Sequence, residues 1–300
     1  MTGVHIGFAA PVSGSWATPD NIDRVAVRSE ELGYHSLWTF QRLLSPPDGN
    51  WGPMYRSVLD PVSVLAYLAA RTSRVRLGVA VVNLPFFAPP LLAKQLGTLD
   101  VLSGGRLDAG LGIGWAEEEY IAVGADRRAR GRRAEEYLPL LRRFWTDPVV
   151  EHSGEFYTVP PTSMDPRPVQ PGGPPVLLGG TAEAALRRAG RMADGWVSSS
   201  RADLAEIGAS IEVVRAAAAD AGRDPAALRM VCRGVVVVGE RRKPLTGSLE
   251  QIRADLGDLA AQGVTEVFVD LNFDPSIGSP DADPAESMRR AEDVMAALAP

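Results

Sequence analysis

The chain has 300 residues, of which 45% are hydrophobic and 23% are charged, and its formal net charge is −6. This balance is typical of a soluble globular protein with a large core, and the negative charge offers no basic surface to nucleic acid or to an anionic membrane. Cys232 is the one cysteine, which allows no intrachain disulfide or thiolate metal cluster and favours a cytoplasmic location. We find no signal peptide in residues 1–10, and no apolar run approaches the roughly 18 residues that a membrane span needs.

Apolar runs and helical patterns alternate through the first half of the chain. A helical pattern with apolar residues spaced three and four apart follows the first run and ends at Gly33, which favours a helix C-terminus. Pro61 opens the next helix, because proline at the first helical position loses no hydrogen bond. Further helical patterns cover about 91–99 and 127–145. The apolar runs lie at 4–9, 36–40, 75–82 and 106–113.

The second half continues the alternation. Its apolar runs lie at 176–178, 196–198, 230–238 and 267–269. The helix between the last two runs carries Ile252, Leu256 and Leu259 on one face, and a final helix follows the last run. Continuous apolar runs are typical of parallel strands that are covered on both faces. We therefore predict an α/β protein in which eight strands close into one (β/α)8 TIM barrel over residues 1–300, with an open doubly wound sheet as the alternative.

Three longer segments interrupt this pattern. Residues 41–59 and 272–284 each follow a strand directly, so in a barrel they are loop insertions at the C-terminal face, where the active sites of barrels are found. Residues 147–175 form a further insertion, with a small hairpin predicted from 149–150 and 156–157. Simple surface insertions are the alternative interpretation.

Glycine-rich segments end the fourth and fifth strands. Residues 110–115 read GLGIGW, whose G-x-G-x-G spacing differs from the G-x-G-x-x-G of dinucleotide-binding folds. These glycines allow either the close approach of a flat ligand or tight packing of neighbouring strands. Gly179, Gly180 and Thr181 open a helix whose partial positive charge, with arginines 187, 188 and 191 nearby, predicts a phosphate site; an ordinary capped turn is the alternative.

Other polar residues give separate indications. Asn83 ends the third strand, where its amide could bond a ring carbonyl. Histidines 5, 35 and 152 lack the spacing of metal ligands, and we predict no metal site. Asp270 and a carboxylate among residues 117–119 could form the acid pair of a glycosidase, which is the least favoured function.

Taken in order, these segments resemble the luciferase-like monooxygenase superfamily, in particular its coenzyme F420-dependent oxidoreductases. The resemblance extends over about residues 3–270, and it is the ordered set that is specific. The matching segments are GYHSLW (33–38), RLGV (76–79), LAKQ (92–95), TLD (98–100), LSGGRL (102–107), GLGIGW (110–115) with Glu119, LGGT (178–181), RAG (188–190) and DGW (194–196).

The resemblance implies a homodimeric barrel that holds a tricyclic ring at its C-terminal mouth. A non-prolyl cis peptide, carried over to the bond between Ala80 and Val81, would back the ring, and Asn83 would contact the ring edge. The cofactor phosphate would lie on Gly179, Gly180 and Thr181. The remaining residues expected near the ring or lining the mouth are Trp38, Gly112, Gly114, Trp115 and Glu118.

One pair of residues departs from the family pattern. Many F420-dependent members carry an Asp-His pair just after strand two, where this chain has Gln41 and Arg42. Arginine stays protonated and is a poor acid–base group, so Arg42 is expected to hold an anionic substrate or a ring oxygen. The proton would then come from solvent, Tyr55 or Glu118. The candidate catalytic residues are therefore Gln41, Arg42 and Glu118.

The resemblance implies an F420-dependent oxidoreductase that transfers a hydride between C5 of the deazaflavin and an unidentified small organic substrate. The alternatives are an FMN-dependent monooxygenase of the same fold and a non-catalytic F420 carrier. No nucleic acid or membrane partner is expected.

Overall fold

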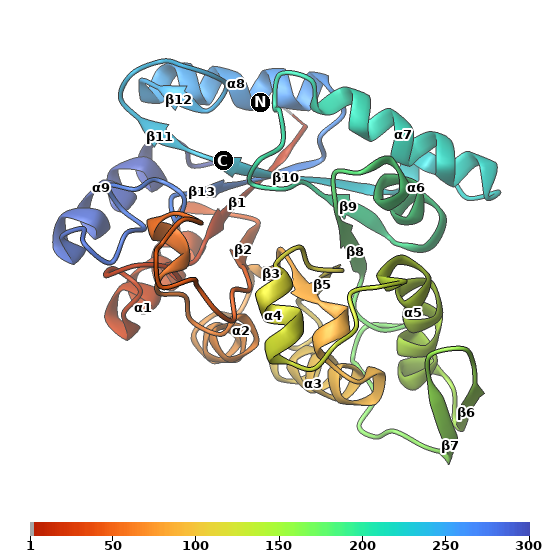
Figure 1. Ribbon diagram of the computed structural model, residues 1–300. Helices are drawn as coiled ribbons and strands as arrows, with labels where there is room; N and C mark the ends of the chain where they lie inside the picture. The colour runs from red at the N-terminus through yellow and green to blue at the C-terminus, as the bar shows by residue number, and fades with distance from the viewer. Residues whose placement is uncertain (1–2) are drawn as a thin grey trace.

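The computed structural model describes residues 3–300, and its centre is a closed barrel of eight parallel strands (Figure 1). The strand β1 pairs with β2 on one side and β13 on the other, and the pairing of β3 with β5 closes the circle. The predicted (β/α)8 barrel is confirmed, and every predicted strand overlaps one barrel strand. These strands are β1 (His5–Ala9), β2 (Ser36–Thr39), β3 (Arg76–Val79), β5 (Leu107–Gly112), β8 (Val176–Gly179), β9 (Gly195–Val197), β10 (Arg229–Val235) and β13 (Glu266–Asp270).

Helices surround the barrel in chain order (Figure 1). They are α1 (Pro19–Leu32), α2 (Pro61–Arg71), α3 (Pro89–Ser103), α5 (Arg130–Thr146), α6 (Glu183–Met192), α7 (Ile207–Asp220), α8 (Leu249–Ala261) and α9 (Pro284–Ala297). The sequence did not locate α7, where alanines lie on both faces, or the six-residue α4 (Glu117–Ala122). Within residues 3–300, no helix is long and apolar enough to cross a membrane.

The helix ends follow from local hydrogen bonds. Thr18 and Asp60 precede α1 and α2, and their side chains accept from the backbone N–H groups of Asn21 and Ser63, as N-terminal caps do. Gly33 ends α1 in the left-handed conformation, with φ of 81°, which glycine adopts without steric cost. The predicted ends of these helices are confirmed.

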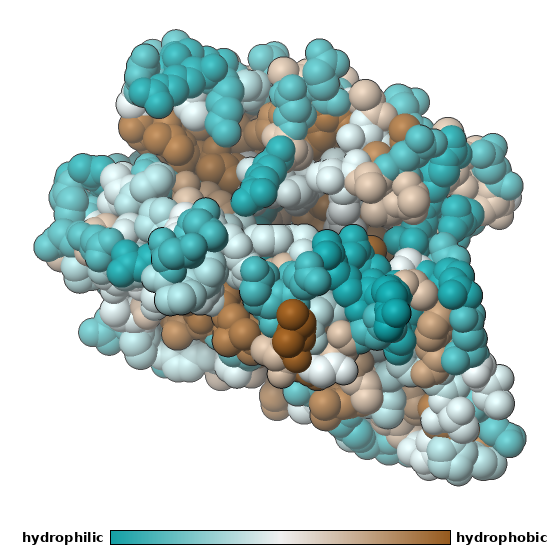
Figure 2. Space-filling model, in the orientation of Figure 1, coloured by the Kyte–Doolittle hydropathy of each residue, from teal (hydrophilic) through white to brown (hydrophobic). Residues whose placement is uncertain are grey.

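Several short elements lie outside the eight barrel strands and their helices. The insertion at 147–175 contains the antiparallel hairpin of β6 (Val150–Ser153) and β7 (Thr158–Thr162), whose strands begin one and two residues later than predicted, and Figure 1 shows it projecting beyond α5. Figure 2 shows a mostly hydrophilic face with a hydrophobic spot over α4, where Ile121 is 74% exposed. The other short elements are β4 (Val82–Asn83), the parallel pair β11 (Val237–Val238) and β12 (Thr246–Gly247), and the 3-10 turns η1 (Pro53–Tyr55), η2 (Leu84–Phe86) and η3 (Pro225–Ala227).

Inward-facing side chains fill the barrel in three layers, because alternate residues of a strand point to the same side. The lower layer is polar and mostly charged, the middle layer is apolar, and the upper layer lies beneath the C-terminal mouth. Successive inward residues therefore belong to successive layers: Ser36 and Trp38 from β2 with Phe40 just after it; Arg229, Val231 and Arg233 from β10; and Glu266, Phe268 and Asp270 from β13.

The lower layer is an ion-pair network around Asp108, whose side chain is fully buried. Arg76 donates to its two carboxylate oxygens at 2.6 and 2.9 Å, and Arg229 does so at 2.6 and 3.0 Å. Arg229 also donates to Glu266 at 2.8 Å. Burial acts to raise the pKa of Asp108, but the hydrogen bonds and charges of the two arginines outweigh burial, so this pKa lies below its ordinary value.

Candidate functional site

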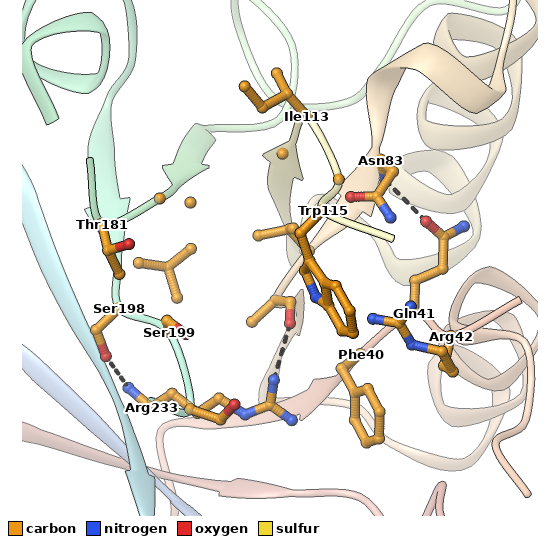
Figure 3. Close-up of a pocket in the computed structure, with 18 of the residues that line it drawn as sticks. Phe40, Gln41, Arg42, Asn83, Ile113, Trp115, Thr181, Ser198, Ser199 and Arg233 are labelled. Carbon is orange, nitrogen blue, oxygen red and sulfur yellow. Dashed lines mark hydrogen bonds between the residues drawn. The ribbon is translucent and has the colours of Figure 1, made fainter. Parts of the chain in front are cut away.

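A cavity of about 250 Å³ lies at the carboxyl ends of the barrel strands (Figure 3). Its walls come from the chain that follows β2, β3, β5, β8 and β9 and from the end of β10, so one end of the barrel supplies all of them. The structure brings most of the expected site residues together in this wall. They are Gln41, Arg42, Ala80, Val81, Asn83, Gly112, Gly114, Trp115, Gly179, Gly180 and Thr181.

Val81 forms an apolar platform in the cavity. The peptide bond between Ala80 and Val81 is cis, where the resemblance places it, and lies between β3 and β4. A Cβ atom on Gly112 would stand 2.5 Å from one methyl of Val81, and a Cβ on Gly179 would stand 2.9 Å from the other. The two glycines thus make room for the Val81 side chain. The two roles considered for glycines at these strand ends, tight packing and a flat surface for a ligand, are therefore compatible.

The segment at 179–181 provides hydrogen-bond donors at one side of the cavity. Gly180 has φ of 147°, and a Cβ there would meet Ala185 at 2.5 Å, so only glycine fits this turn. The N-cap of helix α6 is Ala182, so the exposed Thr181 just before it does not cap the helix. The hydroxyls of Thr181 and of the serines at 198–200 line the cavity. Hydroxyls and the N–H groups of a helix start are suitable donors to a phosphate.

The arginines of α6 are paired with carboxylates of this chain. Arg187 pairs with Glu183 at 2.8 Å, and Arg188 and Arg191 pair with Glu135 at 3.4 and 2.9 Å. None of the three arginines lines the cavity, so any contribution to a phosphate site is through the positive charge that the two carboxylates leave, not through direct contact.

Gln41 and Arg42 lie at the mouth, and both are engaged by other residues. The Gln41 side-chain oxygen accepts from the backbone N–H of Asn83 at 2.9 Å, which ties the end of β2 to β4 (Figure 3). Arg42 pairs with Glu119 at 3.0 Å, and these two side chains are only 6% and 1% exposed. Burial lowers the pKa of Arg42, and Glu119 opposes that effect.

Aromatic rings enclose the Arg42 guanidinium. Its central carbon lies 5.0, 4.9 and 4.6 Å from the ring centroids of Trp51, Tyr55 and Trp115. Glu119 in turn accepts from the backbone N–H groups of residues 43 and 44, at 2.8 and 3.1 Å. The cluster holds the long segment after β2 against α4, while Arg42 remains part of the cavity wall.

Two expected site residues lie elsewhere. Trp38 is fully buried in the middle layer, where it stacks on Phe268 with centroids 4.9 Å apart, and Phe40 reaches the cavity two residues later. The reason is that residues two apart on a strand point to the same side, so Phe40 lies one layer closer to the mouth than Trp38. Glu118 is exposed on α4, while its neighbour Glu119 faces inward, because consecutive helical residues point in different directions.

Arg233 is a cavity residue that the sequence analysis missed. Its Nε donates to Asp270 at 2.6 Å. One terminal nitrogen donates to the Ala80 carbonyl at 3.3 Å (Figure 3). The sequence does contain a signal for it: every second residue of a strand points to the same side, so Arg233 points into the barrel like Val231 and Arg229 on β10. Asp270 is fully buried in this pair and absent from the cavity wall, which removes the free carboxylate that the glycosidase alternative requires.

The described residues offer little support for a metal site or for a reactive cysteine. Within residues 3–300, no group of three or more His, Cys, Asp or Glu side chains is arranged to hold a metal ion. Cys232 is buried in β10, and burial raises the pKa of its thiol to about 12, which keeps the thiol protonated and unreactive.

Comparison with known proteins gives a match over nearly the whole chain. A family model described as luciferase-like monooxygenase matches residues 3–295. An uncharacterized protein of Mycobacterium tuberculosis is 33% identical over 290 residues, which cover 91% of this chain and 93% of the relative. The FMNH(2)-dependent dimethylsulfone monooxygenase of Pseudomonas putida is 28% identical over 207 residues, which cover 68% of this chain and 56% of that enzyme.

Solved structures share the fold over the same length. The monooxygenase RslO1 from Streptomyces bottropensis superposes with a TM-score of 0.81 at 24% identity, covering 98% of both chains. An F420-dependent secondary alcohol dehydrogenase superposes with a TM-score of 0.78 at 15% identity, covering 99% of both chains. At these identities the likeness supports the fold and leaves the cofactor open.

Proposed function

The chain belongs to the luciferase-like monooxygenase family, and we propose that it is an F420-dependent oxidoreductase that transfers a hydride to or from a small organic substrate. The observation that carries the proposal is the Val81 platform, which lies on the cavity floor between Gly112 and Gly179. F420 is the first choice because the ordered sequence segments resemble the F420-dependent branch, and an F420-dependent enzyme shares the fold over 99% of its chain.

The cavity residues fit a flat tricyclic cofactor. The Val81 side chain offers an apolar surface for a ring, and the amides of Asn83 and Gln41 lie at one side for the polar ring edge. Thr181 and Ser199 lie at the other side, where a phosphate would accept their hydroxyl hydrogens. When bound, the deazaflavin supplies hydride chemistry at C5, and the protein supplies position and surroundings.

The residues around the ring position must also supply a proton and exclude water. Glu118 points into solvent, so Tyr55 and solvent itself remain from the three sources that we expected. Tyr55 is 8% exposed, lines the cavity and lies against Arg42, which fixes its ring. We assign it the proton exchange with the substrate. Trp115 covers the same side of the mouth, and its 44% exposure indicates that a ligand could still cover part of it.

A second candidate is an FMN-dependent monooxygenase. It is favoured by the Pseudomonas relative, which is FMNH(2)-dependent, and by Gln41 and Arg42 at the positions of the Asp-His pair. FMN activates oxygen, whereas a 5-deazaflavin does not readily do so. A carrier without catalysis would bind F420 and give no turnover with any acceptor.

Calorimetric titration of the purified protein with F420 and, separately, with FMN separates these functions. The proposal predicts micromolar F420 binding that is about tenfold or more tighter than FMN binding. Tighter FMN binding, accompanied by oxygen uptake when reduced FMN is supplied, would favour the monooxygenase. Binding of neither would contradict every cofactor-dependent function.

We also propose that the protein is a homodimer. Large apolar side chains are exposed on the adjacent helices α2 and α3, where Tyr67, Leu91 and Leu102 are 40%, 52% and 62% exposed. Covering such side chains in a subunit interface would remove apolar surface from water. Sedimentation velocity should give twice the mass of the chain, and a monomer at all concentrations would contradict this assignment.

A further inference from the structure

Arg233 is a buried cation in the cavity to which the proposed function gives no role. Its side chain is 8% exposed and its Nε donates to the fully buried Asp270 at 2.6 Å. The guanidinium carbon lies 4.7 Å from the Phe40 ring centroid and 4.2 Å from that of Phe273. An ion pair and two rings therefore fix the plane of the guanidinium.

The outer edge of this guanidinium remains available. Among residues 3–300, the Ala80 carbonyl accepts one hydrogen of Nη1 at a long 3.3 Å, and no hydrogen bond is made by Nη2. Asp270 is held in place from behind, because its other oxygen accepts from the backbone N–H and the side-chain amide of Asn272, at 2.9 and 3.0 Å. The pair is thus a rigid unit that presents two nitrogens to a cavity.

The position of Arg233 separates it from the groups that fit the cofactor. Figure 3 shows Asn83 and Gln41 at one side of the cavity, Thr181 at the opposite side, and Arg233 along a third side. A cofactor that extends from a phosphate at Thr181 to a ring edge at Asn83 leaves the arginine for a second molecule. The other buried guanidinium of the cavity wall, that of Arg42, is enclosed by aromatic rings and Glu119.

A planar guanidinium edge binds carboxylates through two parallel N–H···O bonds, and a fixed arginine loses little conformational freedom in doing so. On the premise of the proposed function, which places the cofactor over Val81, we propose that Arg233 determines substrate specificity. The substrate carries a carboxylate or an equivalent planar oxyanion, which binds the Nη1–Nη2 edge.

Calorimetric titration of the cofactor-free protein with sodium benzoate and with benzamide, at matched ionic strength, tests this proposal. The two probes share a ring and differ in charge. Benzoate should bind wild type about tenfold or more tightly than benzamide. Equal affinities would overturn the proposal.

The test variant replaces the whole pair, Arg233→Gln with Asp270→Asn, so that no buried charge is left without a partner. It should lose about tenfold or more in benzoate affinity and keep its benzamide affinity. The matched control is Arg201→Gln, which removes an exposed arginine that lies 5.6 Å from the Trp115 ring and should keep the preference for benzoate. Undiminished benzoate binding by the double variant, with an unchanged melting temperature, would overturn the assignment.

A third titration distinguishes substrate from cofactor as the source of the oxyanion. Benzoate should still bind when F420 or FMN saturates the protein; competition between the two would assign Arg233 to the cofactor and overturn the proposal. Absence of binding by either cofactor would contradict the proposed function alone, because the probe titrations of the cofactor-free protein do not depend on it.

Discussion

Replacing Asp108 by asparagine should destabilise the barrel more than any surface substitution of the same kind. Asp108 is fully buried and accepts four hydrogen bonds from Arg76 and Arg229. The substitution keeps the shape of the side chain and removes its charge, so two arginines face each other across a neutral amide. Arg229 keeps Glu266 as a partner, whereas Arg76 loses its salt bridge.

The expected cost follows from the burial of these groups. Removing one partner of a buried ion pair costs about 3–5 kcal/mol. Arg76 and Arg229 are 25% and 27% exposed, so water partly solvates the charges left behind, and we expect about 3 kcal/mol. For a large domain this lowers Tm by roughly 6–12 °C, at about 2–4 °C per kcal/mol. Urea unfolding at about pH 7 measures the same free energy directly.

The pH dependence gives an independent check on Asp108. Its pKa is lower in the folded than in the unfolded protein, so its ionisation stabilises the fold above the unfolded pKa of about 3.9. That stability is lost as the pH falls through this value toward the folded pKa. The difference between wild type and Asp108→Asn should be constant from about pH 5 to 8 and should narrow below about pH 4. Asp220→Asn, at an exposed position, is the control. A loss within about 1 kcal/mol of that control, or a difference that does not change with pH, would refute the reasoning.

Three further predictions concern the cavity and its surroundings. Gly112→Ala places a methyl 2.5 Å from Val81, so we expect a loss of about 1–3 kcal/mol in the free energy of F420 binding or of unfolding. Calorimetry and urea unfolding measure the two, and no change in either would show that the Val81 side chain shifts at no cost. Glu119→Gln leaves the enclosed Arg42 charge without its carboxylate partner, so limited proteolysis should cut the chain within residues 41–59 faster than in wild type. Equal cleavage rates would show that the Arg42–Glu119 pair does not hold this segment in place. Cys232 should react with a thiol reagent only when the protein unfolds, because it is buried and its pKa is raised; a fast reaction of the native protein would contradict this.

The sequence predicted the barrel well because parallel strands that are buried on both faces give continuous apolar runs. It predicted poorly how far along the barrel axis each side chain lies. Trp38 and Phe40 differ by one layer, and only the closed barrel decides which of them reaches the mouth. Among three consecutive glutamates, the pattern does not reveal that Glu119 and not Glu118 faces inward until the orientation of α4 is known.

Arg233 was missed for a related reason. A charged residue in an apolar strand is usually assigned to the strand end or to the solvent face, whereas a closed barrel has an interior where a buried arginine can pair with a carboxylate of the next strand. Its partner was recognised as a candidate acid, but sequence spacing does not show that the two side chains meet. The pairing depends on register across strands that are distant in the chain.

The most direct test of the ring site is a titration with F420 followed by tryptophan fluorescence, in wild type and in Trp115→Phe. The chain has six tryptophans, so the difference between the two proteins isolates the one that lines the cavity. A ring bound over Val81 predicts saturable quenching at micromolar F420 in wild type, with most of the signal lost in Trp115→Phe. Absence of quenching in wild type, or quenching of equal size in both proteins, would contradict a cofactor ring at this mouth.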